Sequence, residues 1–434
     1  MPYQLKLFDL FKKSRINSYY NFFKPFTLQN REFIINYQNQ KLKEQINHFY
    51  NESPYFKRIL DREGVTPNQI KTREDLKSIS PLTREDLKNS LDEMTCKKHK
   101  RNAHYSTSSG TTGLPVKYAK DVNGYSAGVA AGYILWEMAG WKLSYRQLHI
   151  WGNPTSVGKW NKPWSKMKSF IYNKKNIDST LTNTPAGLAQ VVKIIKKFKP
   201  QSIDGYTSAL LNIATYIIQN NIKIIKAKIV ITTAENLLPA QKEIIETALG
   251  PVADLYGCGE INGIAIKSPL DNKFIIFNPH VIVETETIEN SELKEILITD
   301  LDNKLIPMIR YKVGDLIDEV KPPEKDDSYP FEYFTKVNGR QVDLIYLENG
   351  KIISPINLLA GTLFRSIGGI LKHKVIWENN ILFFNFVIDR GFNHKIAQQK
   401  IFEYLKNYDV NFKIVIVDKI LPDSTGKFKY FEKK

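Results

Sequence analysis

Strand and helix segments alternate along residues 147–255, and this alternation constrains the fold more than any other feature of the chain. Apolar runs of strand length are predicted at Gln147–Gly152, Ser202–Asp204, Lys228–Thr233 and Val252–Leu255. Helices are predicted between them at Gly187–Phe198, Ser208–Gln219 and Ala240–Leu249. Strands that alternate with helices of about 10 to 15 residues form mainly parallel sheets that helices cover on both faces. We therefore expect an α/β fold whose ligands bind at the carboxyl ends of the strands.

The chain has 434 residues, more than a single hydrophobic core normally organises. We expect a large domain at residues 1–338, with a helical lead-in at 1–100, and a small, mobile C-terminal α/β domain at 339–434. The small domain is predicted from two strands at Ile381–Ile388 and Phe412–Val417 and a helix at Asn393–Asn407.

A stretch rich in hydroxyl side chains and glycine lies ahead of these strands. Its centre consists of Ser108, Ser109, Gly110, Thr111, Thr112 and Gly113. Glycines can take positive φ and let backbone N–H groups converge on an anion, and the hydroxyls add further donors. It is not a Walker loop, because Pro115 stands where that motif has its second glycine. A polyphosphate-binding loop and an ordinary polar turn both remain consistent with these residues.

Carboxylates follow two of the predicted strands. Thr232–Asn236 closes one strand and contains Ala234 and Glu235, and Asp254–Glu260 closes another. A magnesium ion prefers carboxylate oxygens and commonly takes one or two of them beside water and phosphate. By itself, a glutamate after a glycine is also typical of a solvated loop.

Residues 108–115 read Ser-Ser-Gly-Thr-Thr-Gly-Leu-Pro, and this loop resembles the ATP loop of adenylate-forming enzymes of the phenylacetate–CoA ligase and CapK-type branch. Four further motifs of that branch follow in the same order, over residues 50–434. They are Tyr-Gly-x-x-Glu at 256–260, Arg-Tyr-x-x-Gly-Asp at 310–315, Gly-Arg-x-x-Asp at 339–343 and a closing Gly-Lys-Phe at 426–428. The order of the motifs is more specific than any one of them.

The resemblance implies a role for each matched residue. Ala234, Glu235, Asp254 and Tyr256 would surround the adenine, and Glu260 would hold magnesium on the phosphates. Asp315 would accept hydrogen bonds from both ribose hydroxyls, a task that suits the two oxygens of a carboxylate, and Arg340 would reach the nucleotide. Lys427 would stabilise the charge that develops during adenylation.

The acyl pocket is the least defined part of the site. Trp151, Tyr206 and the Gly257-Cys258-Gly259 turn are candidates because they lie at predicted strand ends beside the nucleotide motifs, and each is equally consistent with a core position. The chain also departs from the branch at the hinge, where Val342 replaces the first of two acids and leaves Asp343 alone.

The resemblance implies ATP-dependent, AMP-forming activation of a small carboxylic acid, with ATP and Mg²⁺ as cofactors and coenzyme A as the expected acyl acceptor. An amine or a hydroxyl of a sugar intermediate in surface polysaccharide synthesis is an alternative acceptor. A non-catalytic nucleotide-binding relative and a nucleic-acid-binding protein are the rival classes.

The composition of the chain argues against nucleic-acid binding, a disulfide framework and a membrane-spanning segment. The net charge of +17 comes from scattered lysines, without a basic block interleaved with aromatics, so we do not expect nucleic acid as a partner. Two cysteines, Cys96 and Cys258, are too few for a disulfide framework. No signal peptide or membrane-spanning segment is evident, so we expect a cytoplasmic protein. Apolar residues between Leu5 and Phe11 would also suit peripheral contact with a membrane, or packing on the large domain.

Overall fold

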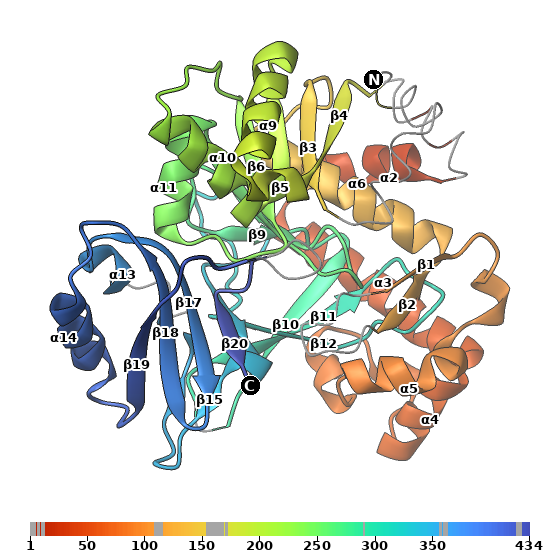
Figure 1. Ribbon diagram of the computed structural model, residues 1–434. Helices are drawn as coiled ribbons and strands as arrows, with labels where there is room; N and C mark the ends of the chain where they lie inside the picture. Colours follow the sequence, from red (N-terminus) through yellow and green to blue (C-terminus); the bar gives the residue numbers. More distant parts are fainter. Residues whose placement is uncertain are drawn as a thin grey trace.

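The computed structural model describes residues 14–107, 116–152, 172–289, 291–355, 363–421 and 428–434, together with residues 6, 9, 169 and 358. Figure 1 shows a large part in which helices surround sheets, coloured from red to cyan, and a smaller blue sheet beside it. The α/β class predicted from the sequence is confirmed.

A central sheet organises the large part, with the strand order β13-β9-β8-β7-β6-β5-β3-β4. Five neighbouring strands are parallel: β3 (Gln147–Trp151), β4 (Lys174–Asp178), β5 (Ser202–Tyr206), β6 (Ile229–Thr233) and β7 (Val252–Tyr256). Three short strands extend the sheet in antiparallel fashion: β8 (Ala265–Lys267), β9 (Phe274–Ile276) and β13 (Tyr333–Phe334). The predicted mainly parallel sheet is therefore confirmed, and the sequence missed β4 and the antiparallel extension.

Helices cover both faces of this sheet. Its parallel strand β5 is buried along its whole length and β6 along nearly all of it, and successive side chains point to opposite faces. Three helices pack on one face: α9 (Pro185–Phe198), α10 (Thr207–Gln219) and α11 (Pro239–Ala248). There, their side chains share a core with Ile203, Val230 and Val252. On the other face, α6 (Val122–Met138) packs on Ile231 and Ala253, and α2 (Ile16–Phe23) packs on α6.

A second sheet is antiparallel, with the order β10-β11-β12-β14. Its strands are β10 (Val281–Thr287), β11 (Lys294–Asp300), β12 (Tyr311–Ile317) and β14 (Val337–Arg340). The helices of the lead-in pack beside it: α3 (Arg31–Glu52), α4 (Pro54–Glu63) and α5 (Arg84–Met94). A hairpin of β1 (His104–Thr107) and β2 (Lys117–Lys120) brackets the hydroxyl-rich loop.

The C-terminal sheet has the order β19-β18-β17-β20 and its own hydrophobic core, formed by residues between 345 and 431. Its strands are β17 (Ile370–Glu378), β18 (Ile381–Ile388), β19 (Asn411–Ile416) and β20 (Phe431–Lys433). Helices α13 (Leu363–Ser366) and α14 (His394–Leu405) and the hairpin of β15 (Ile345–Tyr346) and β16 (Ile352–Ile353) complete this part. The domain boundary between 338 and 339 stays a prediction. It falls within β14.

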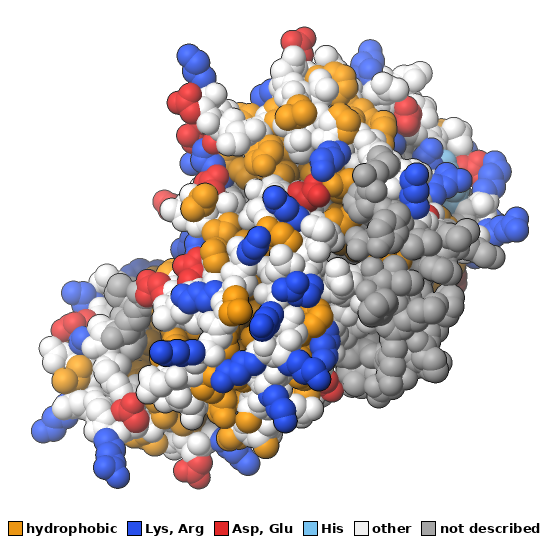
Figure 2. All heavy atoms as spheres, turned by 90° about the horizontal axis from the view of Figure 1, so that it is seen from above, with side chains coloured by type: hydrophobic (Ala, Val, Ile, Leu, Met, Phe, Trp, Pro, Cys, Tyr) orange, Lys and Arg blue, Asp and Glu red, His pale blue; other side chains and the backbone are white. Residues whose placement is uncertain are grey.

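Short 3₁₀ helices connect these elements, at Lys24–Leu28, Pro67–Gln69, Glu74–Ser78, Lys97–His99, Ser179–Asn183 and Gln341–Asp343. Among the described residues, no helix combines the length and the apolarity that a bilayer crossing requires. The apolar residues between Leu5 and Phe11 that suggested membrane contact lie outside the described residues. Figure 2 shows Lys and Arg side chains interspersed with hydrophobic and acidic ones over the face seen from above.

Candidate active site

The carboxyl ends of β3, β5, β6 and β7 lie side by side, because these four strands are parallel and adjacent (Figure 1). Tyr206 pairs with Thr233 at the ends of β5 and β6, and Thr233 pairs with Leu255 on β7. The rings of Trp151 and Tyr206 are 4.4 Å apart. The structure thus brings the described residues Trp151, Tyr206, Ala234 and Tyr256 to one end of the central sheet.

Asp315 lies where three strands meet. The Tyr256 hydroxyl at the end of β7 donates to Oδ2 of Asp315 at 3.0 Å. Asp315 on β12 pairs across the antiparallel sheet with Arg340 on β14, whose Nε lies 3.4 Å from Oδ1. Burial raises the pKa of Asp315, and Arg340 and Tyr256 partly offset this effect. The arrangement is a carboxylate held in place by a phenol and a half-exposed guanidinium, which suits the recognition of a diol next to an anionic group.

Glu260 is 5% exposed and follows β7 in the Gly257–Glu260 turn. The Tyr311 hydroxyl donates to Oε1 of Glu260 at 3.2 Å, and Nη1 of Arg84 lies 4.0 Å from the same oxygen. The tyrosine begins β12 and the arginine begins α5, so the glutamate is held between the central sheet and the lead-in. A carboxylate in this position fits the oxygen ligand that magnesium requires.

Strand β2 fixes the turn that carries Glu260. Nζ of Lys120 donates to the carbonyl of Gly259 at 3.1 Å. A Cβ on Gly259 would lie 2.9 Å from the Tyr118 hydroxyl, so no larger residue fits there without moving Tyr118. Burial lowers the pKa of Lys120. Sequence reasoning missed Lys120, which nothing distinguishes among 62 lysines and arginines.

Asp254 lies in the middle of β7, and Ala234 directly follows β6. The Thr232 hydroxyl donates to Oδ1 of Asp254 at 2.9 Å, and burial raises the pKa of this carboxyl to about 6. Ala234 has a φ of 67°, in the left-handed region that non-glycine residues seldom occupy. Their predicted placement beside an adenine stays a prediction.

Glu235 connects the central sheet with the C-terminal segment. Its carboxylate accepts from the backbone N–H of Ser208 at 2.7 Å and from the Ser208 hydroxyl at 2.9 Å, which caps α10. Oε1 also accepts from the backbone N–H of Phe428 at 3.0 Å. Nearby, Nε2 of Gln241 on α11 donates to the Tyr430 hydroxyl at 2.7 Å. The residues after Lys427 are therefore attached beside the carboxyl end of the sheet.

Two predicted parts of the site lie outside the described residues: Ser108–Gly113 and Lys427. Their roles stay predictions. The described neighbours are Thr107 and Val116 on the loop side and Phe428 on the lysine side.

No protein-family model matches the chain. CapK of Staphylococcus aureus is 22% identical over 414 residues, which cover 91% of this chain and 88% of that protein. The phenylacetate-coenzyme A ligase of Pseudomonas putida is 25% identical over 328 residues, which cover 72% of this chain and 71% of the ligase. The chain is a homologue of CapK and of the phenylacetate-coenzyme A ligases.

Solved structures give the fold of this CapK homologue. 2-Hydroxyisobutyryl-CoA ligase in its postadenylation state superposes with a TM-score of 0.73 at 15% identity, over 92% of this chain and 89% of that one. The same ligase in its thioesterification state gives a TM-score of 0.60 at 16% identity, over 94% and 91%. The amide bond synthetase McbA from Marinactinospora thermotolerans gives 0.52 at 14% identity, over 75% and 67%. The CapK homologue has the fold of adenylate-forming ligases.

Sequence reasoning missed His149 and Asp204. Each lies two residues before a predicted acyl residue on the same strand, His149 before Trp151 and Asp204 before Tyr206. His149 on β3 and Asp204 on β5 are register partners, and Nδ1 of the histidine hydrogen-bonds Oδ2 of the aspartate. The His149 ring stacks on Trp151, with centroids 5.5 Å apart and an interplanar angle of 10°. The alternation of residues 147, 149 and 151 along β3 is the one sequence signal that would have placed His149 on the face of Trp151.

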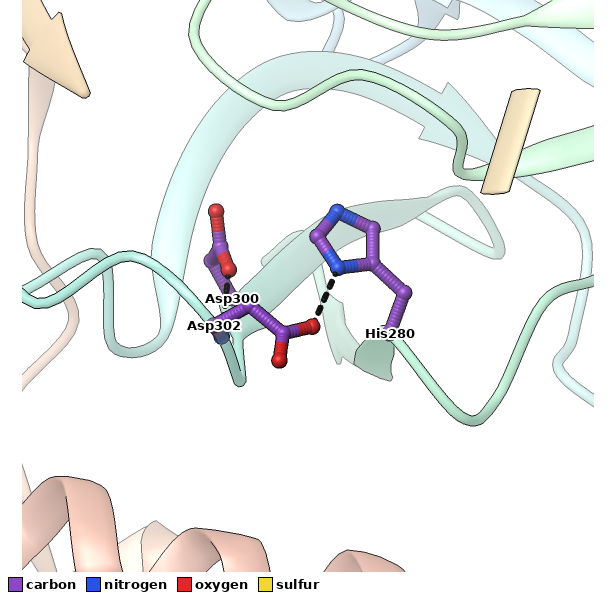
Figure 3. Close-up of side chains that lie close together, drawn as sticks. All are labelled: His280, Asp300 and Asp302. Atoms are coloured by element: carbon purple, nitrogen blue, oxygen red, sulfur yellow. Dashed lines mark hydrogen bonds and ion pairs between the residues drawn. The ribbon is translucent and has the colours of Figure 1, made fainter. Parts of the chain in front are cut away.

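A second histidine–aspartate cluster, of His280, Asp300 and Asp302, is fully buried in the CapK homologue (Figure 3). Nδ1 of His280 lies 2.8 Å from Oδ2 of Asp302, and Asp300 accepts from the backbone N–H groups of residues 302 and 303. Nζ of Lys41 lies 3.4 Å from Oδ1 of Asp302. Burial lowers the pKa of His280, but Asp300 and Asp302 outweigh it and raise the pKa overall. His280, Asp302 and Lys41 thus form a buried network of oppositely charged or polar groups. The three His and Asp side chains also lie close enough together to hold a metal ion.

Proposed function

We propose that this CapK homologue is an AMP-forming acid ligase that activates a carboxylic acid with ATP and transfers the acyl group to coenzyme A. The observation that carries the proposal is the convergence of Asp315, Tyr256, Arg340 and Glu260 at the carboxyl end of the central sheet. These side chains come from β7, the turn that follows it, β12 and β14, and they would supply a diol acceptor, a cation and a magnesium carboxylate within one site. The homologous phenylacetate-coenzyme A ligases and the neighbouring CoA-ligase structures support the same reaction class.

In the first half-reaction, an oxygen of the substrate carboxylate would attack the α-phosphorus of ATP and the bond to pyrophosphate would break. Asp315 would hold the ribose, and Arg340 would offset negative charge beside it. When bound, magnesium would neutralise charge on the phosphates, and Glu260 fits as its protein ligand. Lys427 and the hydroxyl-rich loop would complete the contacts to the phosphates. The product is a mixed anhydride and hence a good acyl donor.

In the second half-reaction, the thiolate sulfur of coenzyme A would attack the acyl carbonyl and AMP would leave. An amine or a sugar hydroxyl is the second candidate acceptor, as the resemblance of the sequence motifs to the CapK-type branch implies. The match to CapK covers 91% of this chain and 88% of that protein. We also propose that residues 339–434 form a small domain that moves between the two half-reactions.

The test is acid-dependent pyrophosphate release from ATP, screened over aliphatic, aromatic and hydroxylated acids, followed by addition of coenzyme A, amines or sugars to the acyl adenylate formed. We expect release with at least one acid class and consumption of the adenylate by one acceptor class. ATP binding without release with any acid would contradict the enzyme assignment and favour a non-catalytic nucleotide-binding relative.

A further inference from the structure

The His149–Asp204 pair has no part in the nucleotide chemistry proposed above, yet its geometry is tightly defined. Asp204 is 3% exposed. Its Oδ1 accepts from Nε2 of Gln147 at 2.6 Å, and its Oδ2 bonds Nδ1 of His149. Both carboxylate oxygens are therefore satisfied by two residues of the adjacent strand. Such a buried pair holds the imidazole in one orientation.

The pair also fixes which ring nitrogen carries the proton. Burial raises the pKa of Asp204, but His149, Lys174 and the hydrogen bond from Gln147 outweigh it and lower the pKa overall. Burial lowers the pKa of His149, against the opposing effect of Asp204. A neutral ring that donates from Nδ1 to a carboxylate presents a lone pair at Nε2. Nε2 has no hydrogen-bond partner within the described part of the chain.

His149 faces the same side of the sheet as the aromatic residues at the strand ends. The His149 side chain is 21% exposed, whereas that of Asp204 is 5% exposed. Trp151 lies two residues further along β3, stacked on the histidine, and its ring lies 4.4 Å from Tyr206. Trp151 and Tyr206 thus offer apolar ring faces between the imidazole and the rest of the sheet end.

Strand spacing gives the distance from the nucleotide residues. β3 is separated from β7 by β5 and β6. Three inter-strand steps amount to about 14 Å. A group that reaches His149 would therefore lie well away from Tyr256 and Asp315, at the end of a substrate opposite the carboxylate that joins the phosphate.

We propose that His149, oriented by Asp204, is a hydrogen-bond acceptor that selects carboxylic acids with a hydroxyl or amino donor at the end distant from their carboxylate. This inference rests on the proposed function and narrows its substrate class. His149 is a specificity residue and takes no part in bond making. Asp204 is a positioning residue, because it acts through the imidazole.

The experiment compares acids that differ by one donor: phenylacetate with 4-hydroxyphenylacetate and 4-aminophenylacetate, and hexanoate with 6-hydroxyhexanoate. KM and kcat for pyrophosphate release are measured for the parent and for His149→Phe, His149→Gln and Asp204→Asn. His394→Phe is the matched control, because His394 is an exposed histidine on α14. Phenylalanine keeps a ring beside Trp151 and removes the acceptor, whereas glutamine restores an acceptor near the position of Nε2.

We expect the parent to favour the donor-bearing member of at least one pair about tenfold, the effect of one good hydrogen bond. His149→Phe should abolish this preference by raising KM for the donor-bearing acid, with little change for the plain acid, and His149→Gln should restore part of it. Asp204→Asn should reduce the preference as well. No preference in the parent, or equal losses for both members of each pair in His149→Phe, would overturn the proposal.

A binding measurement separates failure of this proposal from failure of the proposed function. Calorimetry with the same acid pairs, in the absence of turnover, reports the preference of the parent and of His149→Phe directly. A preference that depends on His149 without pyrophosphate release would sustain the acceptor role and contradict the ligase assignment. Pyrophosphate release without any His149-dependent preference in binding or in KM would support the ligase assignment and contradict the acceptor role of His149.

Discussion

The proposed nucleotide end and the proposed acyl end of the site are built by different means. At the nucleotide end, Asp315 and Arg340 meet through antiparallel pairing of β12 with β14, and Tyr256 reaches them from the central sheet. At the acyl end, His149, Asp204 and Tyr206 come from two adjacent parallel strands. Charged groups of fixed geometry suit a ligand that is the same in every turnover. Aromatic ring faces beside one hydrogen-bond acceptor, Nε2 of His149, suit the selection of one substrate among several.

The strongest way to test the nucleotide end is to remove Lys427. We expect Lys427→Ala to lower acyl-adenylate formation by about a hundredfold or more, the scale of losing one preorganised electrostatic contact. Transfer from an adenylate supplied ready-made should be unaffected, because that step no longer develops charge on the α-phosphate. Lys419→Ala is the control, since Lys419 is exposed on the same part of the chain. Adenylation at the parent rate would remove Lys427 from the site.

Asp315 provides the next largest effect. Asp315→Ala should weaken ATP binding by roughly 1.5–3 kcal/mol, because two ribose hydroxyls lose a charged acceptor. It also frees Tyr256 and Arg340, so the variant is compared with Asp315→Asn, which keeps one oxygen. Asp326→Ala, at an exposed aspartate, is the control. Calorimetric titration with ATP decides: equal affinities in Asp315→Ala and the parent would exclude Asp315 from nucleotide binding.

Glu260 is expected to act through magnesium. Glu260→Gln keeps the shape and the contact to Tyr311 but removes the charge, so higher Mg²⁺ should be needed for half-maximal pyrophosphate release. The difference in the rate of pyrophosphate release between Glu260→Gln and the parent should decrease at saturating Mg²⁺. A variant with the parent's Mg²⁺ dependence would instead indicate that Glu260 only anchors Tyr311 and Arg84.

Substitution of Asp254 should have the smallest effect, and we expect this effect on the unfolding temperature. Its pKa of about 6 in the folded protein lies above the ordinary value of 3.8, so its contribution to stability is present at low pH and is lost as the pH rises through about 6. Asp254→Asn should therefore unfold at a higher temperature than the parent at pH 8, by about 2–4 °C for each kcal/mol relieved. The two midpoints should converge near pH 4. A difference that does not change with pH would contradict the assignment of the raised pKa.

The contrast between the two ends also explains what the sequence could predict. β3, β5, β6 and β7 agree with their predicted positions to within two residues, because a buried parallel strand is a continuous apolar run. Asp315 and Arg340 were recognised from their motifs, but their mutual contact depends on the register of β12 and β14, which no local pattern encodes. The short strands β8, β9 and β13 carry too few residues to show a period.

The side chains that support the site were missed for a different reason. Lys120 and Asp204 have residue types that are normally exposed, and each is buried beside specific partners. Lys120 contacts the Gly259 carbonyl, and Asp204 contacts Gln147 and His149. Such partners are brought together only by the tertiary fold. Residue type and spacing could therefore predict candidate groups for the nucleotide site. They could not predict the groups that hold the Gly257–Glu260 turn and the His149 side chain in place.

The bond between Glu235 and Phe428 has a consequence for measurement. Because the Phe428 amide donates across the chain to a carboxylate that also caps α10, its proton is protected from solvent only while the C-terminal segment rests on that helix. Hydrogen–deuterium exchange at this one amide would thus count the fraction of time the segment is docked. Followed in the presence of ATP, of an acyl adenylate and of coenzyme A in turn, the exchange rate of a single proton would give the opening equilibrium at each stage of the reaction cycle.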